Sequence, residues 1–221
     1  MADGDAPLGA RELRKLDPDR VLTFTDGVFA IIITILVLEL EVPDLNSGQS
    51  LRASLEEMRP TFMAFVVSFL LVGMYWVWHR EVFTRVRYVN RDLVWLNLLF
   101  LLPASMIPFA ASVLGEYSTN ATALHLYGAV LIAVTLMRVV IDWYLRHHPG
   151  LLWASGSRQS RRIGSVLAAA PLVVYVLAMA VADWQPTLSM ILYFSLPLIY
   201  FAFVAFLSSD PRTRQATRDA S

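Results

Sequence analysis

Six long apolar segments constrain the fold of this chain more than any other feature. Each is close to the ~20 residues that a helix needs to cross the hydrocarbon core of a bilayer, at about 1.5 Å of rise per residue. The segments cover residues 21–42, 61–78, 93–114, 121–145, 163–182 and 187–207. A soluble helical bundle would need a polar outer face on each helix, and these segments carry almost none. The sequence therefore predicts an all-α membrane protein with six transmembrane helices in each chain.

Composition agrees with that prediction and narrows the function. The chain has 221 residues, of which 57% are hydrophobic and 16% are charged, and it contains no cysteine. Its sequence also lacks a glycine-rich phosphate loop, a His-Glu-x-x-His zinc motif and a serine-centred nucleophile elbow. We therefore expect neither an enzyme nor a bound metal or cofactor. Nucleic-acid binding is not expected either, because the basic residues follow the membrane topology.

The basic residues lie on alternate connections between the apolar segments. Fifteen of them precede the first segment, follow the sixth, or lie after the second or the fourth, whereas the other connections carry only Arg52 and Arg59. Because Lys and Arg accumulate in cytoplasmic loops, this asymmetry places both termini in the cytoplasm. We predict a cytoplasmic segment at 1–19, a transmembrane domain at 20–208 and a cytoplasmic tail at 209–221. The opposite connections are acidic, which either concentrates cations near an opening or has no functional effect.

The first apolar segment carries an aspartate just inside one end. A carboxylate at that depth is costly unless it has a partner, so Asp26 is a candidate for a structural or functional role. At about 100° per residue, one face of the predicted helix carries Ile31, Ile35 and Leu38. Asp26 lies about 140° away from Ile31. The aliphatic face either contacts lipid or a neighbouring helix, or it lines an axis with Asp26 turned into the bundle behind it.

Partners for Asp26 occur in the next two segments. Trp76 and His79 are three residues apart and share a helix face, and Asn97 lies at a comparable depth. Indole, imidazole and amide groups all donate hydrogen bonds that a carboxylate accepts. We expect a polar clamp that holds the first helix against its neighbours. The alternative is a proton relay through Asp26 and His79, as in a proton-coupled membrane transporter or exporter.

These residues resemble the pattern of a known family. The first segment is similar to the first helix of the transmembrane protein 175 family, which comprises endosomal and lysosomal potassium channels and their prokaryotic single-repeat relatives. The family pattern has a serine where Thr25 stands, and the threonine keeps the hydroxyl group. The residues that carry the resemblance are Arg20, Phe24, Thr25, Asp26, Trp76, His79 and Asn97.

The resemblance implies an architecture and a function. Single-repeat members assemble as homotetramers in which the first helix of each subunit lines a central pore. By position, Ile31, Ile35 and Leu38 would form the pore constriction, and Thr34 would contribute to selectivity. The resemblance implies a potassium-preferring cation channel in the lipid bilayer, with K⁺ as the permeant ion. We expect it in the plasma membrane of a prokaryote.

Overall fold

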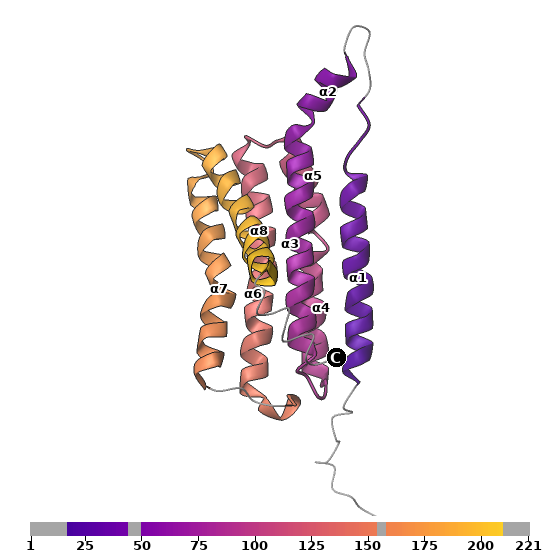
Figure 1. Ribbon diagram of the computed structural model, residues 1–221, viewed down its shortest axis with the longest axis vertical. Coiled ribbons are helices and arrows are strands. Elements are labelled where there is room, and N and C mark those ends of the chain that lie inside the picture. Colours follow the sequence, from indigo (N-terminus) through magenta and orange to yellow (C-terminus); the bar gives the residue numbers. More distant parts are fainter. Residues whose placement is uncertain (1–16, 44–49, 154–157, 210–221) are drawn as a thin grey trace, which may run out of the picture.

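The computed structural model describes residues 17–43, 50–153 and 158–209. The predicted cytoplasmic segments at 1–19 and 209–221 fall almost entirely outside the described residues. Within the described part the chain is helical, and a β-bridge joins Val86 to Leu152. The elements in chain order (Figure 1) are α1 (Pro18–Leu38), α2 (Leu51–Glu57), α3 (Arg59–Phe83), α4 (Arg91–Ala104), α5 (Ile107–Glu116), α6 (Ala121–His147), the 3₁₀ turn η1 (Pro149–Leu151), α7 (Arg158–Val181) and α8 (Pro186–Ser209).

Four helical stretches have the length and the apolar character to cross a membrane. They are α1, α3, the pair α4–α5 taken together as Arg91–Glu116, and α6. The described apolar stretches of α7 and α8 are shorter, at Ala170–Val181 and Pro186–Tyr200. Four of the six predicted spans thus correspond to helices with the length and apolar character to cross a membrane, and the other two coincide with α7 and α8.

The third predicted span is broken into α4 and α5. Pro103 lies near the end of α4, and Pro108 lies in the first turn of α5. Proline has no backbone N–H, and its ring clashes with the carbonyl of the preceding turn, so two prolines this close interrupt the helical hydrogen bonds. Pro171 and Pro197 lie inside α7 and α8 without ending either helix.

The ends of α1 follow from its capping residues. The carboxylate of Asp17 accepts the backbone N–H of Asp19 at 3.0 Å. Pro18 suits the first turn, where no N–H needs a helical partner. The helix therefore begins before the predicted boundary at residue 20. It ends at Leu38, earlier than the predicted end at residue 42, and Pro43 disfavours helical geometry at Val42.

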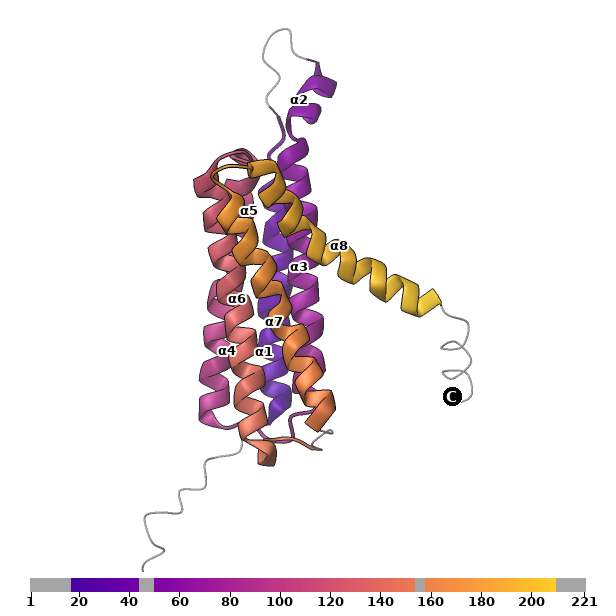
Figure 2. The same cartoon turned by 90° about the vertical axis from the view of Figure 1, so that its left-hand side faces the viewer.

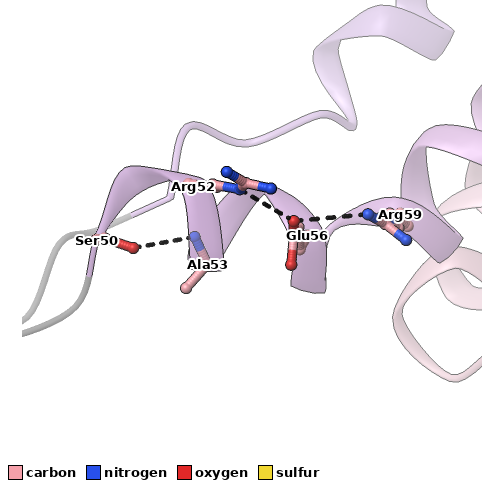
Figure 3. A network of polar contacts seen from close by, with 5 residues as sticks. All are labelled: Ser50, Arg52, Ala53, Glu56 and Arg59. Carbon is pink, nitrogen blue, oxygen red and sulfur yellow. Dashed lines mark hydrogen bonds and ion pairs between the residues drawn. The ribbon is translucent and has the colours of Figure 1, made fainter.

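The short helix α2, which the apolar pattern does not predict, lies between α1 and α3. The Ser50 hydroxyl caps it by accepting the N–H of Ala53 at 3.3 Å. Glu56 lies 3.4 Å from Arg52 and 3.6 Å from Arg59 (Figure 3). Exposed pairs of this kind contribute about 0–1 kcal/mol. Glu56 contacts both arginines that depart from the topological asymmetry, and its one negative charge offsets one of their two positive charges.

Two buried hydrogen bonds set the position of α3 against α6. The hydroxyls of Ser68 and Tyr127 are 2.9 Å apart, and those of Tyr75 and Thr135 are 2.8 Å apart. The later residue of α3 pairs with the later residue of α6, so the two helices run in the same direction. A hydroxyl buried at membrane depth has no water to bond, and each pair therefore satisfies groups that would otherwise be costly.

The helix α8 begins alongside the bundle and then diverges from it. The Tyr193 hydroxyl donates to the backbone carbonyl of Leu124 on α6 at 3.1 Å. Tyr175 of α7 lies beside it, with ring centroids 6.1 Å apart. The second half of α8 leaves the other helices at a wide angle (Figure 2). The sixth predicted span therefore packs on the bundle through its first half.

The close approach of α5 to α3 at Gly115 gives a testable prediction. A methyl group added there would lie 2.8 Å from Thr61 Cα, which is backbone and cannot rotate away. We expect Gly115→Ala to lower the free energy of unfolding by about 1–3 kcal/mol. Gly73→Ala is the matched control, because its added methyl meets no atom within 4 Å. Thermal unfolding in detergent compares the two, and equal midpoints would contradict the packing at Gly115.

Candidate functional site

The helix α1 has one face packed in the bundle and one face uncovered. Its packed face carries Thr25, Phe29, Ile32 and Leu36, all of which are buried. The opposite face carries the predicted constriction residues, and their exposed fractions are 58% for Ile31, 39% for Ile35 and 74% for Leu38. Phe24 lies on the same side and is 54% exposed. In the single chain, therefore, an aliphatic face at membrane depth has no helix packed over it.

Thr34 lies beside this aliphatic face and is exposed. Its hydroxyl donates to carbonyls of its own helix, at 3.0 Å from Ala30 O and 2.9 Å from Ile31 O. A hydroxyl that donates backward in this way keeps its oxygen lone pairs available as acceptors. Thr34 thus offers the uncovered face an oxygen that water or a cation can bind.

Behind the aliphatic face, three polar side chains form a buried chain of hydrogen bonds. The Asn97 amide nitrogen donates to the Thr25 hydroxyl at 2.9 Å. The Asn97 carbonyl oxygen lies 2.8 Å from His79 Nε2. All three residues are buried, with exposed fractions of 0%, 0% and 1% for Thr25, His79 and Asn97. The chain connects α1, α3 and α4, so it opposes rotation of α1 against its neighbours.

Aromatic rings enclose His79 within this chain. Phe83 stacks on the imidazole with ring centroids 4.1 Å apart, and Phe100 stacks at 5.8 Å. Phe29 of α1 lies at 6.5 Å. The sequence did not predict that these three phenylalanines pack around His79, although the spacing of His79 and Phe83, one helical turn apart, was a usable signal.

Asp26 is bonded, but it is not the buried member of the motif. Trp76 Nε1 donates to Asp26 Oδ1 at 2.7 Å, and the aspartate is exposed in the single chain. The guanidinium of Arg80 lies over the Trp76 ring, 5.7 Å from its centroid. We predicted that Asp26 points into the bundle. In the structure its neighbour Thr25 is buried instead, and Asp26 lies at the flank of α1. Arg20 is exposed in the first turn.

The alternative, a proton relay from Asp26 to His79, has no hydrogen bond between these two residues in the described structure. Asp26 is held by Trp76, and His79 is held by Asn97. Because an amide oxygen only accepts, His79 donates from Nε2, which leaves Nδ1 as the acceptor nitrogen. Among the described residues, Nδ1 is buried without a hydrogen-bond partner. The same residues contain no group of three His, Cys, Asp or Glu side chains placed to hold a metal ion.

Comparison with known proteins gives consistent matches. The sequence profile of the family described as endosomal/lysosomal potassium channel TMEM175 matches residues 20–108. A potassium channel of Chryseobacterium sp. (strain P1-3) is 34% identical over 185 residues, which are 82% of this chain and 91% of that protein. A potassium channel of Streptomyces collinus is 39% identical over 130 residues, which are 57% of this chain and 63% of that protein.

A solved structure extends the likeness to the fold. The crystal structure of a lysosomal potassium-selective channel TMEM175 homolog from Chamaesiphon minutus superposes with a TM-score of 0.75 at 27% identity. The superposition covers 84% of this chain and 96% of that one.

The membrane-length helices define a multi-pass membrane protein, and the matches to known proteins identify its class as an ion channel and not an enzyme. It belongs to the TMEM175 family, as the resemblance in its first segment predicted.

The buried chain of hydrogen bonds predicts a strong effect at Asn97. Asn97→Leu would leave the buried Thr25 hydroxyl and His79 Nε2 without partners, at a cost of about 1–3 kcal/mol for each group. We expect the midpoint of thermal unfolding in detergent to fall accordingly.

A matched pair at Thr25 isolates the hydroxyl. Thr25→Val removes the acceptor and should destabilise the protein, whereas Thr25→Ser keeps the acceptor and should retain most of the stability. A double-mutant cycle of Thr25→Val with Asn97→Leu measures the coupling between the two positions. Additive effects would mean that the two side chains do not act as one unit.

Proposed function

We propose that this chain forms a homotetrameric, potassium-preferring cation channel whose pore is lined by α1 of each subunit. The observation that carries the proposal is the uncovered aliphatic face of α1, with Ile31, Ile35 and Leu38. One chain presents one such face and cannot enclose a path by itself. Four copies around an axis would bring these side chains into three successive rings.

The contacts behind the face support its orientation toward the axis. Thr25, Asn97 and His79 hold the packed side of α1, and Trp76 holds Asp26 at the flank. Because these contacts hold α1 on two sides, its rotation is fixed and its aliphatic side faces a defined direction. A helix that only contacted lipid would need no such fastening, because lipid does not distinguish one aliphatic face from another.

The chemistry of the face supports a hydrophobic gate. Ile31, Ile35 and Leu38 have no oxygen atoms, so a cation that passes them keeps its water or meets a dry barrier. Such a ring gates conduction by dewetting when it is narrow. The Thr34 oxygens, beside the aliphatic rings, would contribute the polar contacts at this level and so affect the choice between potassium and other cations.

The membrane orientation is part of the proposal. Six spans, with both termini in the cytoplasm, agree with the distribution of Lys and Arg along the chain. We propose the plasma membrane of a prokaryote as its location. The relatives named as bacterial potassium channels support this assignment and the potassium preference.

Assembly is the first test. We expect native mass spectrometry in detergent to give a complex of four chains of 24.8 kDa each. Trp76→Phe removes the donor to Asp26 and should weaken assembly more than Trp95→Phe, which replaces an exposed tryptophan of α4. A stable monomer that still conducts potassium in liposomes would contradict the tetrameric pore.

Permeation is the second test. Ile31→Ala widens the proposed constriction, so we expect a several-fold increase in potassium flux through proteoliposomes and weaker discrimination against sodium. Ile33→Ala is the matched control, because Ile33 is half-buried and packs against the bundle. A proton-sensitive dye in the same vesicles reports proton movement. Equal effects of the two substitutions would show that α1 does not line the path.

A further inference from the structure

A second feature lies at the end of the bundle where α3 and α6 stop and α4 begins, the lower end in Figure 1. We call it the basic end; the arginines at its helix ends and in its loop include Arg20, Arg80, Arg85, Arg87, Arg91 and Arg146. There the loop after α3 is tied to the segment after α6. The Arg87 N–H donates to Leu151 O at 2.7 Å, and the Trp153 N–H donates to Arg85 O at 3.0 Å. These bonds flank the β-bridge of Val86 with Leu152.

These hydrogen bonds place the Arg87 guanidinium beside two aromatic rings. The Arg87 Cζ lies 4.9 Å from the centroid of the Tyr88 ring and 5.1 Å from that of Trp153. Val86 and Val89, with exposed fractions of 2% and 0%, anchor the loop in the core. Arg87 is thus an exposed cation on a loop that is held by two buried valines and by hydrogen bonds to the segment after α6.

Within the described residues, Arg87 makes no ion pair and its side chain donates no hydrogen bond. The nearby carboxylates have other partners, since Glu81 pairs with Arg85 and Asp92 accepts the Tyr144 hydroxyl at 3.3 Å. Stacking on aromatic rings uses the faces of a guanidinium and leaves its N–H groups free to bind a planar or tetrahedral anion in the same plane.

We propose that Arg87, with Tyr88 and Trp153, binds the phosphate of an anionic phospholipid headgroup. The chemistry of a stacked arginine fits a phosphate oxygen pair. The position favours a lipid as its source, because the site lies at the helix ends, where headgroups meet the protein. Trp153 is 68% exposed, and Trp143 on the last turns of α6 is 54% exposed. Tryptophans at such positions sit at the membrane interface.

The other arginines of the basic end strengthen this choice. Anionic lipids enrich the cytoplasmic leaflet, and clusters of Lys or Arg beside spanning helices attract them. The inference uses the proposed orientation of the chain in the membrane and does not depend on the pore. A protein that fails to conduct can still bind the lipid, so the two proposals fail separately.

The test compares two arginines that are two positions apart. Full-length protein is titrated with phosphatidylglycerol or with phosphatidylcholine of the same acyl chains, and bound lipid is counted by native mass spectrometry. We expect Arg87→Gln to weaken phosphatidylglycerol binding about tenfold, because it removes a charge-assisted phosphate contact. Arg85→Gln removes the same charge from a residue already paired with Glu81, and should weaken binding less than about twofold. Phosphatidylcholine binding should be unaffected.

Further variants and a competition arm separate the explanations. Arg87→Lys keeps the charge but loses the planar fork, and Trp153→Leu removes one ring; both should give intermediate losses. Equal losses for Arg87→Gln and Arg85→Gln would overturn the site in favour of diffuse charge. A wild-type protein without preference for phosphatidylglycerol would also overturn it. Inorganic phosphate that displaces the lipid at equal concentration would identify a soluble ligand and overturn the lipid assignment. Unchanged thermal midpoints establish that the variants are folded.

Discussion

The buried hydrogen bonds from Thr25 through Asn97 to His79 determine what the rest of the structure can do. Each of the three groups would be costly to leave unpaired at membrane depth, so the three hydrogen-bonded side chains come together as a unit or not at all. It joins three helices and sets the rotation of α1. Because that rotation is set, the face with Ile31 and Ile35 stays outside the bundle. An aliphatic helix alone has no preferred rotation, since any of its faces suits a lipid environment equally well.

Helical periodicity predicted the uncovered face and the partners in the neighbouring helices, but not which polar residue is buried. Thr25 and Asp26 are adjacent, so both lie behind the aliphatic face at angles that periodicity allows. The deciding factor is desolvation: a hydroxyl with one partner is far less costly to bury than a carboxylate. The structure accordingly buries Thr25 and leaves Asp26 at the flank with the Trp76 indole. Helical angles combined with the cost of desolvation would have predicted a buried Thr25 and an exposed Asp26.

The fold itself followed from apolar length in its first four spans, and less well elsewhere. Length and hydropathy do not report where a helix is interrupted, because Pro103 and Pro108 are both apolar and remain within the predicted span. They also do not report α2, whose seven residues are held by local contacts of Ser50 and Glu56. The path of α8 depends on which helices it packs against, such as the Tyr193 contact with α6, and periodicity within one segment contains no such information.

The two ends of the bundle use their charges in different ways. At the end that carries α2, Arg52 and Arg59 share Glu56, and other described carboxylates, among them Glu39, Glu41, Glu57 and Glu116, outnumber these arginines. This excess of negative charge would raise the local concentration of cations. At the basic end, Arg85 is paired with Glu81, Arg80 lies over Trp76, and Arg87 lies over two rings with no ion pair among the described residues. Charge that only set the topology would need no aromatic support, because the orientation rule counts residues and not contacts. The rings beside Arg87 therefore support the proposed use of that cation after insertion, which is to bind an anion at headgroup depth.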